Sequence, residues 1–297
     1  MIAELVEPVG ALLGEGPQLF PDGTLRWVDL LAGIAFIRQE GHSSVAARYP
    51  HEVSKVLPWV HGHLALTRTG VEMVAESGET VATIDLTAGD SSLRCSDATV
   101  LPHGGIAVGI VDRDLAPGRG SLVVVHPDGG ITCAVDRATI PNGIDVMPDG
   151  VEVVWVDSPT HTLTRFTIDP ASGNLVNPRE WVTFPPSLGV PDGLCADTKG
   201  GVWVAMWGGA QVVHVDKTGT ITATISLTVD HVTSVAFDVD DTLVITTGSV
   251  ALSEDERTQT VGAGGLWGVK ASVHGTRGLP PRIATLALPP TFAPRSA

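Results

Sequence analysis

The stretch VWVAMWGGAQVVHVDKTGTITATI, residues 202–225, decides the fold. Val, Ile, Trp and Thr dominate its three runs, as they do in β-strands, and Gly-Gly and Lys-Thr-Gly separate the runs as turns. The pattern therefore predicts three strands joined by two tight turns, which is an antiparallel meander. Similar β-rich runs recur at residues 26–37, 121–130, 151–158 and 242–248. No long stretch carries the apolar spacing of an amphipathic helix.

Composition supports an all-β chain. The 297 residues include 34 Gly and 21 Pro, so turn formers are abundant and the elements should be short and many, which excludes a helical bundle. Apolar residues make up 43 %, enough to bury a full core.

Charge and hydropathy limit the partners. Lys and Arg total 18 against 33 Asp and Glu, a net charge of −15, which excludes nucleic acid and disfavours anionic membranes. The longest apolar run, residues 30–37, is interrupted by Gly33 and fits a strand better than a membrane span.

The three cysteines, Cys95, Cys133 and Cys195, are odd in number and lack C-x-x-C spacing. Structural disulfides and a zinc knuckle are therefore not expected.

The N-terminal residues MIAELVEPVG lack the basic and apolar regions of a signal peptide. We expect a cytoplasmic protein.

A repeat emerges when the β-rich units are aligned. Glu15, Asn142 and Asp192 stand 12, 13 and 11 residues before Trp27, Trp155 and Trp203. One anchor per unit, at residues 15, 60, 97, 142, 192 and 234, gives steps of 45, 37, 45, 50 and 42 residues. A β-rich repeat of this length is typical of a four-stranded propeller blade. The alternative is a β-sandwich with accidental periodicity.

Six anchors predict an all-β, six-bladed β-propeller with four-stranded antiparallel blades. Residues 1–297 should form one domain, with residues 288–297 as a frayed tail. Trp27, Trp155 and Trp203 follow the repeat and are expected to pack in the core.

The tripeptide Pro-Asp-Gly occurs in two settings. At residues 21–23, 127–129 and 148–150 it lies between strand runs, where Pro and Gly suit a tight turn. At residues 191–193 it occupies the anchor position instead, aligned with Pro-Asn-Gly at 141–143. The fourth copy is therefore expected to have a different role.

Equivalent anchor positions should form a ring at one mouth of the central channel. The ring contains Glu15, Asn142 and Asp192, two carboxylates and an amide, which are hard oxygen ligands. Two acids confined together repel each other unless a cation lies between them. The pattern predicts a divalent metal site, with calcium as the first candidate and magnesium, manganese or zinc as alternatives. Each tripeptide alone would be an ordinary turn.

Three segments also carry a family resemblance: LLGEGPQLFPDGTLRWVD (12–29), IPNGIDVMPDGVEVVWVDSPTHTLTRFTID (140–169) and VPDGLCADTKGGVWVAMWGGAQVVHVDKTG (190–219). Together they resemble the signature blocks of the gluconolactonase/regucalcin (senescence marker protein) family, and the resemblance extends from residue 15 to residue 275. It implies a six-bladed propeller whose axial divalent metal is held by Glu15, Asn142 and Asp192. It further implies sugar lactone hydrolysis, with Asp192 as the general base.

A fourth block, LRCSDA at residues 93–98, resembles the family's Arg-x-Asn-Asp-Gly motif. The resemblance implies that Arg94 and Ser96 contact the substrate, and Asp114 falls near a position that often carries a substrate-contacting acid. Ser96 stands where Asn is common, and a hydroxyl is shorter than a carboxamide, so a substrate other than a sugar stays open.

The function expected from the sequence is metal-dependent opening of a lactone, first of all an aldonolactone, by metal-activated water. One alternative is a lactonase, esterase or phosphotriesterase-like hydrolase acting on a non-sugar substrate. Another is a non-catalytic propeller in which the metal is only a structural staple. The partner in the first reading is a small-molecule lactone.

Overall fold

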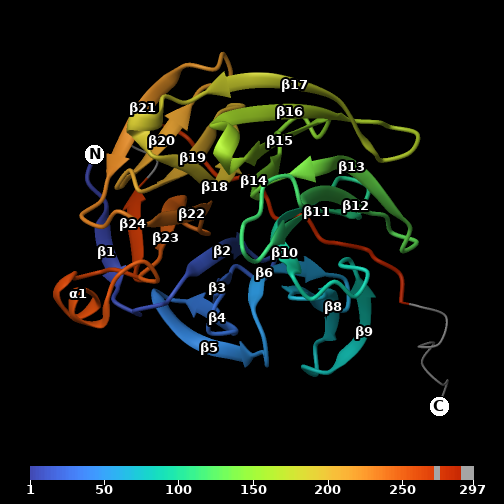
Figure 1. Ribbon diagram of the computed structural model, residues 1–297, viewed down its shortest axis with the longest axis horizontal. Helices are drawn as coiled ribbons and strands as arrows, with labels where there is room; N and C mark the ends of the chain where they lie inside the picture. The colour runs from blue at the N-terminus through green and yellow to red at the C-terminus, as the bar shows by residue number, and fades with distance from the viewer. Residues whose placement is uncertain (271–274, 289–297) are drawn as a thin grey trace.

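The computed structural model describes residues 1–270 and 275–288, in which 24 strands form six four-stranded sheets. The sheets are arranged around a central axis, and all paired strands within them are antiparallel (Figure 1). The predicted six-bladed β-propeller is confirmed.

Each blade is built from consecutive strands except the last. Blade 1 contains β2 (Gly14–Leu19), β3 (Leu25–Asp29), β4 (Ile34–Gln39) and β5 (His42–Arg48). Blade 2 contains β6 (Val53–Trp59), β7 (Gly62–Thr67), β8 (Gly70–Ala75) and β9 (Thr80–Asp85). Blade 3 contains β10 (Leu93–Val100), β11 (Ile106–Asp112), β12 (Gly120–Val125) and β13 (Ile131–Ala138).

The second half of the chain forms the other three blades. Blade 4 contains β14 (Pro141–Val146), β15 (Glu152–Asp157), β16 (Thr162–Ile168) and β17 (Leu175–Thr183). Blade 5 contains β18 (Val190–Ala196), β19 (Val202–Trp207), β20 (Gln211–Val215) and β21 (Ile221–Ser226). Blade 6 contains β22 (Val232–Phe237), β23 (Thr242–Thr247), β24 (Leu266–Lys270) and β1 (Glu4–Glu7). Short helical segments are η1 (Ser158–Thr160), η2 (Pro186–Leu188) and α1 (Glu254–Gln259).

The first strand of the chain closes the ring. β1 pairs antiparallel with β24 and so completes blade 6 from the opposite end of the sequence. Glu7 at the end of β1 accepts hydrogen bonds from the Ser43 backbone amide (2.6 Å) and from the Arg38 guanidinium, which also forms an ion pair with it. Blade 6 is thereby tied to the outer strands of blade 1.

The core lies between neighbouring blades. Trp27 and Trp203 are fully buried and Trp155 is nearly so, which confirms their expected packing role. Trp27 stacks on Phe36 with ring centroids 4.3 Å apart. Apolar side chains of facing blades pack together in this way around the whole ring.

The two settings of Pro-Asp-Gly are also confirmed. In the turns, Asp22, Asp128 and Asp149 each accept a backbone N–H two residues further on, at 2.9 Å, and the following Gly has a positive φ. The copy at residues 191–193 lies within β18. There a Cβ on Gly193 would lie 2.1 Å from Ser234 Oγ, so this glycine is required by the close approach of neighbouring inner strands.

One of the six anchors was wrong. Residue 60 follows β6, at the opposite end of this inner strand from the other anchors, because Trp59-Val-His-Gly forms the turn between β6 and β7. The backbone irregularity that marks the anchor level in blade 2 lies between Val53 and Lys55, so Ser54 takes the equivalent position.

The segment 275–288 crosses the end of the channel opposite the anchor residues. It pairs with blade 5 through Thr198, whose amide donates to Arg277 O (3.0 Å), and with blade 2 through Ala284, whose amide donates to Pro58 O (2.9 Å). Its residues Leu279 to Arg282 line a small cavity of about 70 Å³ inside the channel.

The expected frayed tail falls mostly outside the described residues, which end at Leu288, itself partly buried against a core cluster. Within residues 1–270 and 275–288 there is no helix whose length and apolar character would suit a bilayer crossing.

Replacing Glu7 by Ala should lower the free energy of unfolding by about 2–3 kcal/mol, because the mostly buried Arg38 loses its charged hydrogen-bond partner. The matched control is Glu4→Ala on the same strand, where the residue is exposed and the change should stay within about 0.5 kcal/mol. Urea unfolding measures both variants, and equal effects would contradict the proposed tie between blades 6 and 1.

Candidate active site

The three predicted ligands lie at one mouth of the channel. Glu15, Asn142 and Asp192 are near the first residues of β2, β14 and β18, where each strand departs from regular pairing through a bulge. Bulges change the direction in which side chains point, and all three of these side chains line one cavity of about 430 Å³. The structure therefore brings the three residues together, and their role as metal ligands stays a prediction.

Hydrogen bonds organise the floor of this cavity. Asn142 Nδ2 donates to Asp192 Oδ1 and to Ser158 Oγ (3.2 Å), and Ser158 Oγ in turn donates to the Pro191 carbonyl (2.7 Å). Glu15 Oε2 accepts from its neighbour's amide, Gly16 N, at 3.2 Å. Blades 4 and 5 are thus linked directly through Asn142, Ser158 and Asp192.

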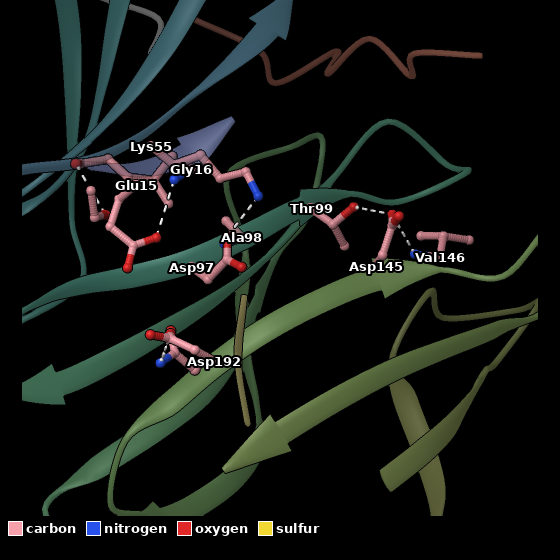
Figure 2. A network of polar contacts seen from close by, with 12 residues as sticks. Glu15, Gly16, Lys55, Asp97, Ala98, Thr99, Asp145, Val146 and Asp192 are labelled. Carbon is pink, nitrogen blue, oxygen red and sulfur yellow. Dashed lines mark hydrogen bonds and ion pairs between the residues drawn. The ribbon is translucent and has the colours of Figure 1, made fainter. Parts of the chain in front are cut away.

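Burial and mutual repulsion act on the two acids. Asp192 is only 7 % exposed, and Figure 2 shows the Glu15 and Asp192 carboxylates approaching the same region from different strands. Burial, followed by the charge of Asp97, raises the pKa of Glu15 to about 8. Burial, followed by the charge of Glu15, raises the pKa of Asp192 well above its ordinary value. A cation between them would favour both charged forms.

A buried ion pair lies immediately below this floor. Lys55 Nζ contacts Asp97 Oδ1 at 2.6 Å, and both side chains are less than 10 % exposed. Asp97 Oδ1 also accepts the Ala98 amide (2.7 Å). In Figure 2, Lys55 reaches Asp97 from the strand adjacent to Glu15. Because Lys55 and Asp97 act on Glu15 with opposite signs, this pair limits the negative charge at the channel mouth.

The predicted substrate contacts are not all in the same place. Arg94 and Ser96 line the cavity together with the three ligands, Arg94 with its Nη1 bonded to the Cys95 carbonyl at 2.9 Å. Asp114 is exposed on the loop after β11, and its neighbours Arg113 and Leu115, rather than Asp114 itself, are among the lining residues.

Sequence reasoning missed several residues of the site. Ser54 and Ser158 line the cavity, and Lys55 lies beneath it. One signal was available: Lys55 is the only charged residue in the run VSKVLPW, all of which is buried. A lone lysine in such a strand indicates a buried acidic partner. Ser158 follows a strand end and carried no such signal.

The residues present fit a divalent cation. Two carboxylates and an amide are oxygen donors of the kind that calcium, magnesium and manganese accept. Burial and neighbouring acids raise the pKa values of both carboxyls, and a cation beside them would favour their charged forms. Among the described residues no three His, Cys, Asp or Glu side chains are grouped to hold a metal, and this ring contains two such side chains with Asn142 as its third donor.

The fold and site define a six-bladed propeller with an acidic, oxygen-rich cavity at one end of its axis. Residues 13–249 match the family model described as the SMP-30/gluconolactonase/LRE-like region. The chain therefore belongs to this family, and the resemblance inferred from the sequence is confirmed.

Individual relatives extend this finding. YvrE of Bacillus subtilis (strain 168), whose name assigns it provisionally as a sugar lactone lactonase, is 30 % identical over 94 % of this chain and 98 % of its own length. Regucalcin of Oryctolagus cuniculus is 28 % identical over 94 % of this chain and 96 % of its own length. The crystal structure of a calcium-binding protein, regucalcin, from Agrobacterium tumefaciens superposes with a TM-score of 0.86 at 24 % identity, covering 96 % of this chain and 97 % of that one. The family match and the lactonase relative support lactone hydrolysis as the reaction class, whereas the structural likeness, at 24 % identity, shows the fold alone.

The raised pKa of Glu15 predicts how stability depends on pH in the metal-free protein. Between the ordinary value of 4.5 and about 8, the folded state keeps a proton that the unfolded state has lost. Each pKa unit of difference corresponds to about 1.4 kcal/mol of folding stability. Because the folded state binds this proton more tightly, the contribution of Glu15 to stability is complete below pH 4.5 and is lost as the pH rises through 8.

Chemical unfolding with chelator present measures this dependence. Glu15→Gln should flatten the decline between pH 5 and 8, whereas Glu4→Gln, at an exposed position, should leave it unchanged. A profile that is identical in wild type and Glu15→Gln would contradict the assigned electrostatics.

Proposed function

We propose that this protein is a divalent-metal-dependent hydrolase that opens a lactone ring. The observation that carries the proposal is the convergence of Glu15, Asn142 and Asp192 in one cavity whose wall also includes Arg94 and Ser96. Membership of a family with lactonase relatives supports the reaction class. The name of the B. subtilis relative supports a sugar lactone as the first substrate to test.

Glu15, Asn142 and Asp192 would hold the cation. When bound, a divalent cation polarises a carbonyl oxygen and lowers the pKa of water, and calcium is the first candidate because one structural relative is a calcium-binding protein. Magnesium, manganese and zinc are alternatives. The three side chains leave one side of the site facing the open cavity, where a substrate can enter.

Asp192 is proposed as the general base. Its carboxylate lies on the cavity floor and takes a proton from the water whose oxygen attacks the lactone carbonyl carbon. The bond between that carbon and the ring oxygen then breaks, and the ring oxygen takes the proton back from Asp192 to become a hydroxyl, which regenerates the carboxylate. The product is a hydroxy acid, which is anionic at neutral pH.

Arg94 and Ser96 are proposed to position the substrate. The Arg94 guanidinium presents several donors suited to lactone oxygens, and the Ser96 hydroxyl can donate or accept one hydrogen bond. Asp114 stays a predicted contact whose position is outside the cavity lining. The three cysteines are free thiols, and the cytoplasmic location expected from the sequence stays a prediction.

Asp192→Ala should reduce kcat by at least about a hundredfold, because it removes both a ligand and the base. The matched control is Asp240→Asn, an exposed acid outside the cavity lining, which should keep wild-type turnover. A pH-stat assay with an aldonolactone and an aliphatic lactone measures the rates, and circular dichroism checks the fold.

The same assay separates catalysis from a purely structural metal. Turnover that chelator removes and calcium, magnesium, manganese or zinc restores supports the hydrolase. Full activity of folded Asp192→Ala would overturn the assignment, and metal binding without any lactone or ester turnover would favour the non-catalytic propeller.

Arg94→Gln should raise KM about tenfold or more, with a smaller effect on kcat, because a charged hydrogen bond to the substrate contributes about 1.5–3 kcal/mol. Arg137→Gln on the exposed outer strand β13 is the matched control and should leave KM unchanged. Steady-state kinetics on the best substrate measures both variants, and an unchanged KM for Arg94→Gln would contradict its role.

A further inference from the structure

The mouth of the cavity is lined by exposed apolar side chains. Leu31, Leu115 and Val250 are 41 %, 46 % and 40 % exposed, and all three line the cavity. They come from three separate connections, in blades 1, 3 and 6. Large apolar side chains left in water by independent loops around one opening are typical of a binding surface. We name these three residues the apolar rim.

The wall below the apolar rim is also apolar. Leu13, Ile140, Val190 and Trp207 also line the cavity, and all four are half-buried. Trp207 is held in place by packing against His231, with ring centroids 4.3 Å apart. These four side chains therefore give the cavity an apolar wall, in which Trp207 is positioned by its contact with His231.

Polar partners are few above the floor. Among the described residues, five charged side chains line the cavity. Arg113 is the one that does not belong to the group formed by Glu15, Arg94, Asp97 and Asp192. Its guanidinium is already bonded to Glu52 Oε1, at 2.6 and 3.0 Å. Hydroxyl groups placed along the wall would lose water without gaining partners, which lowers affinity.

The cavity volume fits a ligand larger than a bare ring. Its 430 Å³ falls in the range of about 300–1,000 Å³ typical of pockets for drug-sized ligands. A lactone ring on the floor leaves space beside Leu115, Val250 and Trp207.

We propose that the lactone taken by this site carries an apolar substituent, an alkyl chain or aromatic group, that lies against Leu115, Val250 and Trp207. This inference rests on the proposed function and specifies its substrate class. The ring sits on the polar floor within reach of Arg94 and Ser96, and the substituent extends toward the apolar rim. A polyhydroxylated aldonolactone matches the floor but not the wall.

A matched series of γ-lactones tests the proposal. The metal-loaded full chain is assayed by pH-stat with γ-lactones whose alkyl group grows from none to octyl, beside a 1,4-aldonolactone of the same ring size. We expect kcat/KM to rise about three- to fourfold for each added methylene until the wall is covered, as burial of about 0.8 kcal/mol per CH₂ requires. The longer alkyl lactones should exceed the aldonolactone. A flat series, or preference for the aldonolactone, would overturn the inference.

Variants of the rim locate the effect. Leu115→Asn and Val250→Asn should each reduce the increase in kcat/KM along the series, so that the octyl lactone loses at least fivefold more than the unsubstituted ring. Val239→Asn is the matched control, since Val239 is 65 % exposed and does not line the cavity. Equal effects of all three substitutions would count against the proposal.

Two further outcomes are distinct. Rim variants that change the molecular mass in light scattering, but not the chain-length dependence, would show that the rim is a contact between copies of the chain and would overturn the inference. Turnover of none of the lactones would overturn the proposed function itself, whereas turnover independent of chain length contradicts the substituent alone.

Discussion

The pairing of β1 with β24 is the constraint on which the rest of the molecule depends. A row of six sheets left open would expose the apolar faces of its first and last blades, which here pack against each other, and without β1 the outer edge of β24 would lose its partner strand. Glu15, Asn142 and Asp192 come from blades 1, 4 and 5, which belong to separate hydrogen-bonded sheets. Their mutual positions therefore follow from the closed ring as a whole. Thr233 reinforces the closure, because its hydroxyl donates to the Gly14 carbonyl beside Glu15 (2.5 Å).

The closed ring holds together charges that would separate in an open chain. Glu15 and Asp192 are both disfavoured in their ionised forms. The charge of Asp97 adds to this effect, and its ion-pair partner Lys55 offsets part of it at Glu15. Packing energy from the surrounding blades offsets this local cost, as is common where a site is built for a ligand and not for stability. The glycines beside the ligands have the same origin, because Gly143 and Gly193 allow the inner strands to approach closely enough to form the site.

Much of the fold could be predicted from local sequence. Contacts between near neighbours in the chain determine the meander at residues 202–225, the three Pro-Asp-Gly turns and the repeat spacing. The anchor positions of Glu15, Asn142 and Asp192 follow from that spacing. The anchor at residue 60 was wrong because a turn after β6 resembled the pattern. The ion pair of Lys55 with Asp97, and the meeting of Leu31, Leu115 and Val250, depend on how separate blades are placed around the ring. The lone lysine of the buried run 53–59 indicates that an acidic partner exists, but no local pattern identifies it as Asp97 or records the contacts of the rim. Ring closure by residues 4–7 left no signal for the same reason.

The segment 275–288 affects how substrate and product enter and leave the channel. It lies across the channel at the end away from the acids, anchored to blades 2 and 5, with Leu279 to Arg282 over the inner cavity. A propeller channel that is covered at one end does not connect the two faces of the molecule. In a lactone hydrolase of the kind proposed, the neutral substrate enters and the anionic hydroxy acid leaves through the same open end of the channel. A product molecule that lingers there excludes the next substrate by occupation alone.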